Sequence, residues 1–179
     1  MKWMTLTGIA MVGMMAAAAI PNKQTLFVQT LNQKKNRYMS EGVFTGGRAG
    51  TGATVLGVRR TYSAKAQIER VIVEMGDKDG KGEADHLGFF QASMDPANNR
   101  MVLDLTQIKT ALVTEQKLKD LFKTSAFVSN PEFTLDPEDK TGSMVFHLKR
   151  PMKMEVFQLH SKGKPSRVVI DLTPMPVKR

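Results

Sequence analysis

Short runs of apolar residues, separated by clusters of turn-forming residues, recur along the chain from Ala53 onward. The runs are rich in Val, Ile, Leu, Phe and Met, and Gly, Pro, Asn, Asp and Lys stand between them. Short runs with regularly spaced turn signals predict an all-β sandwich or barrel. The predicted strands span residues 54–61, 69–75, 89–94, 100–105, 127–129, 143–148, 153–159 and 167–172.

One segment departs from this pattern and predicts a short helix. Thr114 is suited to cap a helix that reaches about Lys123, because its hydroxyl can accept from a free backbone N–H of the first turn. Leu118, Leu121 and Phe122 would then share one face. We expect this helix between the two halves of the domain.

Two stretches, residues 89–106 and 156–173, align without a gap. They read FFQASMDPANNRMVLDLT and VFQLHSKGKPSRVVIDLT, and each joins two predicted strands through a turn rich in Pro, Asn, Gly and Lys. The identical pairs are Phe90/Phe157, Gln91/Gln158, Arg100/Arg167, Val102/Val169, Asp104/Asp171, Leu105/Leu172 and Thr106/Thr173. The pattern predicts the same hairpin made twice, within two repeats at about 53–106 and 127–173. We expect a sandwich of two antiparallel sheets related by pseudo-twofold symmetry.

Alternation along the strands assigns each side chain to a face of its sheet, because successive side chains point to opposite sides. Burial of the apolar set between two sheets is favourable by about 25 cal/mol per Å². The set that contains arginine and aspartate is costly to bury, and we expect it to face outward. Its charged members are Glu74 and the five candidate site residues, Arg70, Arg100, Asp104, Arg167 and Asp171.

Two interpretations of this outward set stay open. The residues could form cross-strand charge pairs, with Arg70 beside Asp104 and Arg100 beside Glu74, each pair contributing a few tenths of a kcal/mol. Alternatively, they form a shallow, repeated binding surface for a polar ligand. The two interpretations can both hold, because binding surfaces often contain internal ion pairs.

The start of the chain predicts export. A lysine at position 2, an uncharged stretch and a run of alanines have the order of a signal peptide, which we place at residues 1–19. The alternative is a retained membrane anchor, since the stretch approaches a spanning length. Residues 20–52 are polar and rich in glycine, which predicts a flexible segment. The sandwich is expected at 53–173, and a short basic tail at 174–179.

The chain is basic, with 26 Lys and Arg against 17 Asp and Glu, and it has no cysteine. Disulfides, thiolate metal sites and cysteine nucleophiles are therefore excluded. An exported basic protein meets polyanions such as peptidoglycan, lipopolysaccharide and teichoic acids. The alternative to binding a polyanion is a basic surface that only maintains solubility.

Catalytic motifs are not evident in the sequence. The histidines, His86, His147 and His160, have no metal-ligand spacing, and no Gly-x-Ser-x-Gly motif is present. We therefore predict a protein that is not an enzyme and has no metal or other cofactor. Two tyrosines and the lack of interleaved basic and aromatic residues argue against nucleic acid as a partner.

The repeated Arg-x-Val-x-Asp-Leu motif at 100–105 and 167–172, with RVIVE at 70–74 and VLGVRR at 55–60, resembles the AMIN domain. This module occurs at the N-terminus of periplasmic N-acetylmuramoyl-L-alanine amidases and of type IV pilus and related secretins. The resemblance covers residues 53–173, and here the module would stand without a catalytic domain.

The resemblance implies two symmetry-related sheets that bind peptidoglycan in the periplasm, with Arg70, Arg100, Asp104, Arg167 and Asp171 as ligand-binding residues. The sequence departs from the pattern in three places: Ser143 replaces a third arginine, His147 replaces an acid, and the helical insert lies at 111–124. Symmetric binding by both sheets is therefore in question.

The expected function is a non-catalytic periplasmic protein that attaches to peptidoglycan and has no stable membrane span once the signal is cleaved. The alternative is an assembly module that docks onto a pilus, a secretin, an amidase or another envelope complex, with an exposed sheet edge pairing with a partner strand. Binding of anionic lipid through charge is a weaker third candidate.

Overall fold

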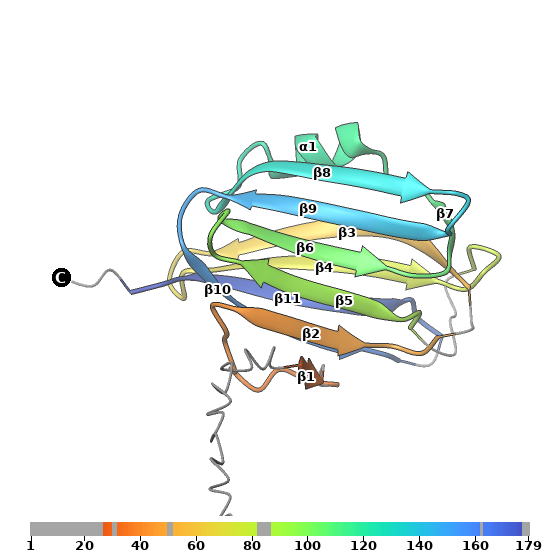
Figure 1. The fold of residues 1–179 in the computed structure, drawn as a ribbon, viewed down its shortest axis with the longest axis horizontal. Coiled ribbons are helices and arrows are strands. Elements are labelled where there is room, and N and C mark those ends of the chain that lie inside the picture. Colours follow the sequence, from red (N-terminus) through yellow and green to blue (C-terminus); the bar gives the residue numbers. More distant parts are fainter. Residues whose placement is uncertain (1–26, 30–31, 50–51, 82–86, 162, 177–179) are drawn as a thin grey trace, which may run out of the picture.

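Two β-sheets packed face to face form the protein, as Figure 1 shows. The computed structural model describes residues 27–29, 32–49, 52–81, 87–161 and 163–176. Sheet A has six strands in the order β1-β2-β5-β6-β9-β8, and sheet B has five in the order β10-β11-β4-β3-β7. The prediction of an all-β sandwich with one short helix is confirmed.

The elements of the fold have the following bounds. Sheet A contains β1 (Phe27–Gln29), β2 (Gly42–Gly46), β5 (Phe90–Asp95), β6 (Arg100–Leu105), β8 (Val128–Asp136) and β9 (Thr141–Leu148). Sheet B contains β3 (Ala53–Ser63), β4 (Ile68–Gly76), β7 (Ile108–Ala111), β10 (Met152–Leu159) and β11 (Ser166–Pro174). The helix α1 spans Glu115–Phe122.

Each sheet takes one hairpin from each repeat. The first repeat supplies the hairpins β3-β4 and β5-β6, and the second supplies β8-β9 and β10-β11. The order β5-β6-β9-β8 in sheet A becomes β10-β11-β4-β3 in sheet B when the repeats are exchanged. The pseudo-twofold relation therefore holds, although neither repeat forms a sheet alone.

The hairpins β3-β4 and β8-β9 match in backbone detail, even though few of their residues are identical. The register shifts between Val55 and Gly57 in β3, and at the equivalent place between Val128 and Asn130 in β8. The hairpin turns also match, because Gln67 (φ 51°) and Lys140 (φ 54°) adopt the same left-handed conformation. Two shared irregularities at equivalent positions support a duplication independently of residue identity.

The second pair of hairpins corrects part of the ungapped alignment. Phe90 pairs with Leu105, whereas Phe157 pairs with Val169 and not with Leu172. The connection at 160–165 is longer than the one at 96–99, and the resulting odd shift turns Phe157 to the opposite face. The alignment of β6 with β11 holds, but the equivalence of Phe90 with Phe157 and of Gln91 with Gln158 is wrong.

The inner faces of both sheets form one apolar core, as the alternation predicts. Met101, Leu103 and Leu105 from β6 are at most 1% exposed. Their counterparts on β11, Val168 and Ile170 among them, are fully buried. Burial of these side chains supplies the main stabilisation of the sandwich.

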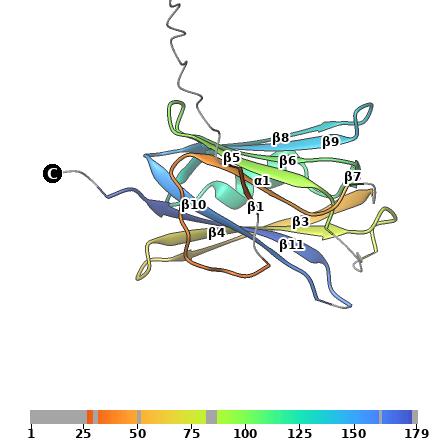
Figure 2. The same cartoon turned by 60° about the horizontal axis from the view of Figure 1, so that its bottom comes forward.

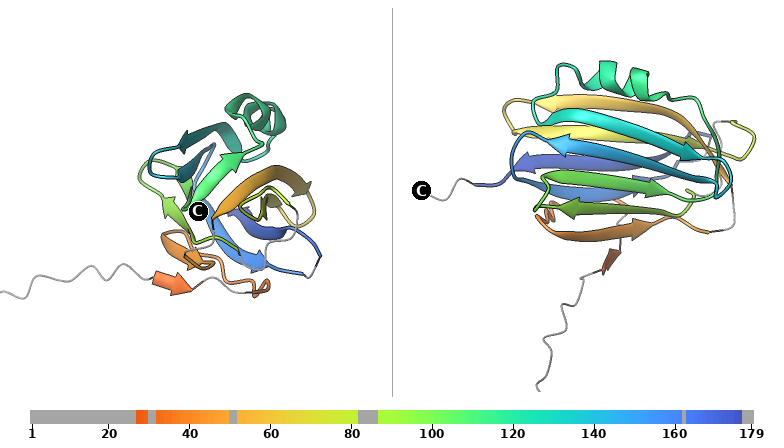
Figure 3. Two further views of the ribbon diagram at one scale, coloured as in Figure 1. Left: turned by 90° about the vertical axis from the view of Figure 1, so that its right-hand side faces the viewer. Right: turned by 45° about the horizontal axis from the view of Figure 1, so that its top comes forward.

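One open side of the sandwich is closed by α1, which lies between the strands β3 and β8 (Figure 3, left). Thr114 caps the helix as predicted, accepting from the backbone N–H of Lys117 at 3.3 Å. Leu118 and Phe122 are buried in the core. The helix is followed by Ser125, whose hydroxyl donates at 2.6 Å to the buried carboxylate of Glu69.

The opposite side is closed by residues 32–46, which run from the edge of sheet B to the edge of sheet A (Figures 2 and 3). Met39 exchanges two backbone hydrogen bonds of 2.8 Å with Met154 on β10, and β2 then pairs with β5. Residues 27–29 and 42–46 belong to the segment predicted to be flexible, and they form strands instead. The predicted signal peptide, 1–19, lies outside the described residues, and within these no helix is long and apolar enough to cross a membrane.

Candidate binding faces

The five predicted site residues lie on the outer faces of the two sheets. Arg100 and Asp104 belong to β6 in sheet A, and Arg70, Arg167 and Asp171 belong to sheet B. Each points away from the core, because it alternates along its strand with side chains that are buried between the sheets. The alternation therefore places the side chains correctly, but the two faces differ in what surrounds them.

On sheet B, Arg70 pairs with Asp171. The guanidinium donates to both carboxylate oxygens, at 2.6 and 2.9 Å, and lies 5.5 Å from the centre of the Phe157 ring. The predicted pair of Arg70 with Asp104 is wrong, because β4 and β6 belong to different sheets. Asp171 is also fully buried, so the expectation that it faces solvent is wrong.

The cover over Asp171 is a segment before β2, residues 32–41, which we call the N-terminal clamp. Its Lys34 ammonium binds Asp171 and lies 3.8 Å from an oxygen of Glu155. The backbone N–H groups of Lys35 and Arg37 donate to the other Glu155 oxygen at 2.7 and 3.1 Å. The clamp thus binds two carboxylates of β10 and β11 with an ammonium and a backbone nest.

The left-handed residue Asn36 (φ 56°) shapes this nest, because it turns two neighbouring N–H groups toward one acceptor. Glu155 is only 1% exposed, so these bonds replace the water that its carboxylate loses. Its oxygen Oε2 has no hydrogen bond among the described residues, and the nearby Lys34 ammonium provides its countercharge.

The charged groups of Lys34, Asp171 and Arg70 stabilise one another. Burial alone would raise the pKa of Asp171, but hydrogen bonds from Arg70 and Lys34 outweigh it and hold the pKa below its ordinary value. Burial would also lower the pKa of Lys34, but the hydrogen bonds to Asp171 and Tyr38, together with the charge of Asp171, outweigh burial and raise this pKa. Both groups are therefore charged at neutral pH.

Arg167 lies opposite Glu74 on the same face of sheet B. The Glu74 carboxylate accepts from Arg59 at 2.6 Å instead. The Nε atom of Arg167 is buried and has no hydrogen-bond partner among the described residues. The structure therefore does not bring Arg167 together with the Arg70–Asp171 pair in a single contact.

On sheet A, Arg100 is held at one nitrogen only. Its Nε donates to Asp95 at 3.0 Å, and its side chain is 45% exposed. The terminal nitrogens make no hydrogen bond within the described part of the chain. The predicted pair with Glu74 is wrong, because Arg100 lies opposite His147, which in turn contacts Glu132 at 3.0 Å.

Asp104 is half-buried and has a neutral partner. It lies opposite Ser143, whose hydroxyl donates to its Oδ1 at 2.8 Å. Its Oδ2 has no hydrogen bond, and no cation contacts the carboxylate, among the residues that the structure describes. On the other side it faces Gln91, whose side-chain amide is likewise without a partner there. Sheet A therefore presents an uncovered polar face with one partly free guanidinium and one uncompensated carboxylate.

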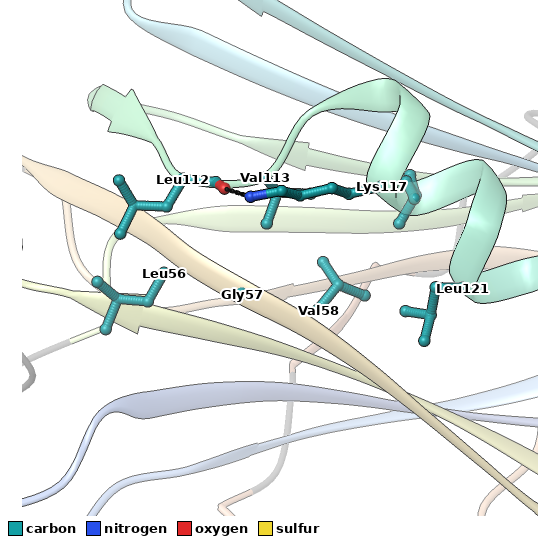
Figure 4. Close-up of a pocket in the computed structure, with 8 residues that line it drawn as sticks. Leu56, Gly57, Val58, Leu112, Val113, Lys117 and Leu121 are labelled. Carbon is teal, nitrogen blue, oxygen red and sulfur yellow. Dashed lines mark hydrogen bonds between the residues drawn. The ribbon is translucent and has the colours of Figure 1, made fainter.

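The molecule also has an apolar groove between β3 and α1 (Figure 4). Its volume is about 250 Å³, and Leu112 at its rim is 57% exposed. Lys117 is the one titratable residue among those that line it, so the groove offers no pair of groups for acid–base catalysis. Its lining residues are Leu56, Gly57, Val58, Leu112, Val113, Lys117, Leu118 and Leu121.

No cluster of three or more metal-ligating side chains occurs within the described residues. His147 and Glu132 are adjacent but lack a third ligand there, and His86 lies outside the described residues. His160 contacts the hydroxyl of Ser166 at 2.8 Å.

The sequence did not predict the roles of Glu155 and Lys34, the two residues that hold the N-terminal clamp on sheet B. Glu155 carried a signal, because it is an acid between the apolar residues Met154 and Val156, and such a group must be paired when buried. Lys34 carried no such signal, because it lies in a polar stretch and contacts its partner across more than a hundred residues of sequence.

A comparison of the sequence with protein-family models finds no match, and a comparison with curated proteins finds none either. The resemblance to the AMIN domain stays a prediction.

Proposed function

We propose that this chain is an exported, non-catalytic binding protein that attaches to peptidoglycan in the periplasm through the outer face of sheet A. The observation that supports the proposal most is the uncovered polar face, on which the Arg100 side chain is 45% exposed and keeps its terminal nitrogens free of described partners. Sites for small molecules are concave and enclose most of the ligand, so a shallow polar face suits an extended polymer better than a small substrate.

The chemistry of peptidoglycan fits this face. Its stem peptides carry carboxylates, and a guanidinium recognises a carboxylate with two parallel hydrogen bonds. The formal net charge of +9 adds a long-range attraction to an anionic polymer. In this proposal Arg100 provides the specific contact, and the remaining basic residues raise the rate of encounter.

Co-sedimentation with purified sacculi tests the proposal. We expect the wild-type protein to pellet with sacculi at roughly 0.15 M salt, where exposed charges are screened beyond about 8 Å. Arg100→Ala should lower retention several-fold. Arg59→Ala is the matched control, because it removes the same charge from an exposed residue of sheet B. Folded wild-type protein that stays in the supernatant would end the proposal, and equal retention of the two variants would clear Arg100 of the role.

Docking onto an envelope protein complex is the second candidate. It is favoured by the apolar groove with its exposed Leu112, and by β3, whose pairing with β7 ends at Val55. An extended partner segment could lie along such an edge. Cross-linking in cells separates the candidates, because protein adducts that survive glycan digestion support docking, and their absence counts against it.

A further inference from the structure

Because the two sheets are related by a pseudo-twofold axis, each outer residue of sheet A has a counterpart on sheet B, and the contacts of the two can be compared. Asp171 lies opposite Glu155 and Arg70, and Asp104 lies opposite Gln91 and Ser143. Asp104 is thus the counterpart of Asp171. In the same way Gln91 is the counterpart of Glu155, and Ser143 that of Arg70.

On sheet B this position is occupied by a peptide. The N-terminal clamp crosses the face of β10 and β11, places the Lys34 ammonium on Asp171, and donates two backbone N–H groups to Glu155. The chain therefore contains its own example of how such a face holds a peptide that carries a primary amine.

On sheet A no described segment covers the equivalent position or brings a positive charge to it. Ser143 stands where sheet B has Arg70, so Asp104 faces a hydroxyl across the strands, and no ammonium from the described residues contacts it. The side-chain carbonyl of Gln91 can accept a backbone N–H, as Glu155 does. A partly buried carboxylate without a countercharge favours the binding of a cation from outside the chain.

We propose that Asp104 and Gln91 bind the free side-chain amine and adjoining backbone of an uncross-linked stem peptide of peptidoglycan. This inference rests on the proposed function and names the group that is recognised. Asp104 receives the ammonium, Gln91 accepts a backbone N–H, and Ser143 orients the carboxylate. Arg100 lies four residues earlier on the same face of β6, about 13 Å away, where it meets a carboxylate of the same polymer.

Chemical acetylation of the sacculi tests the proposal, because an amine-binding site and simple charge attraction predict opposite changes in the amount of protein bound. Acetylation converts free amines to neutral amides, so the polymer becomes more negative. A basic protein that is held by charge alone should bind acetylated sacculi as well as, or better than, untreated sacculi. The proposal predicts the opposite, a loss of at least about five-fold.

Asp104→Asn tests the residue directly. The variant keeps an acceptor for the Ser143 hydroxyl, and it makes the net charge of the protein more positive. We nevertheless expect it to bind untreated sacculi several-fold more weakly than the wild type. Acetylation of the sacculi should not change its binding. Glu132→Gln is the matched control, because it removes one negative charge from a different residue of sheet A and should retain wild-type binding. Thermal unfolding of both variants confirms that they are folded.

The outcomes are distinguishable from those of the proposed function. If the protein pellets with sacculi, but neither acetylation nor Asp104→Asn lowers its retention, the amine site is overturned and attachment to peptidoglycan stands. If folded wild-type protein binds neither form of sacculi, both proposals fall.

Discussion

At the scale of single residues, Asp104 and Asp171 occupy equivalent strand positions but differ in their surroundings. Both follow the motif Arg-x-Val-x-Asp, and both lie on the outer face of a sheet. Asp171 is fully buried between Arg70 and Lys34. Among the described residues, Asp104 accepts a hydrogen bond from the hydroxyl of Ser143 alone. One carboxylate is a structural anchor, and the other is available for a ligand.

The two aspartates should therefore differ in their contribution to stability. Removal of one partner from a buried ion pair costs about 3–5 kcal/mol. Arg70 and Lys34 have side chains that are 37% and 28% exposed and can regain water, so we expect Asp171→Asn to lower the free energy of unfolding by about 2 kcal/mol. Asp104→Asn should lower it by less than about 0.5 kcal/mol, because its acceptor for Ser143 survives. Urea unfolding measures both, and equal losses would contradict the assignment of roles.

The contribution of Asp171 should also depend on pH. Its pKa is lowered in the folded state, so its stabilising effect is complete above the unfolded pKa of about 3.9 and is lost as pH falls through the lower folded value. The difference in unfolding free energy between the wild type and Asp171→Asn should be constant from about pH 5 to 7 and shrink below about pH 4. A difference that grows on acidification would have the wrong sign.

Residue alternation predicted which way these side chains point, since that follows from the geometry of a strand. It did not predict which partners they meet. Arg70 pairs with Asp171 because β4 adjoins β11, and that adjacency comes from the exchange of hairpins between sheets, which no local pattern encodes.

At the scale of elements, the N-terminal clamp covers the outer face of one sheet, sheet B. It has no regular secondary structure, and it is held by backbone contacts to Glu155 and Met154 together with the ion pair of Lys34. Its composition is polar and predicts only a flexible segment. The structure that it adopts depends on acceptors that β10 and β11 place in register more than a hundred residues later.

Limited digestion with trypsin tests the clamp, because Lys35 and Arg37 are themselves cleavage sites. Their N–H groups bind Glu155 in the folded protein, so cleavage requires local opening. Glu155→Ala should raise the cleavage rate after these residues several-fold relative to cleavage after Arg167, which reports opening of the core strand β11. Glu132→Ala on sheet A is the control and should leave the rate unchanged. Unchanged cleavage in Glu155→Ala would show that the nest does not hold the clamp.

Some strands could be predicted from the sequence and others could not. The strand pair β6 and β11 was predicted with the correct alignment, because its apolar alternation is uninterrupted. The strand β8 is longer than predicted, because Pro131 and acidic residues interrupt the apolar run that the prediction relied on. The alignment of β5 with β10 failed because a longer connecting turn, not the strand residues, sets the register.

At the scale of the whole molecule, duplication produces two related faces, and a single short segment makes them unequal. The sheets share strand order, bulges and turn conformations. The N-terminal clamp covers the face of sheet B with Lys34 and its backbone, and no other described segment lies over the face of sheet A in the same way (Figure 2). Pattern analysis predicted the duplication and questioned symmetric binding on the basis of Ser143 and His147, while the physical cause of the asymmetry lies in the clamp.

The most direct test maps the binding of a soluble stem peptide onto the backbone amides by NMR, using a synthetic tripeptide with a free lysine side chain. We expect the largest chemical-shift changes at Gln91, Asp104 and Ser143, and little change along β4 and β11. A tripeptide that shifts the amides of β4 and β11 most, or that shifts none at millimolar concentration, would contradict the claim that sheet A is the binding face.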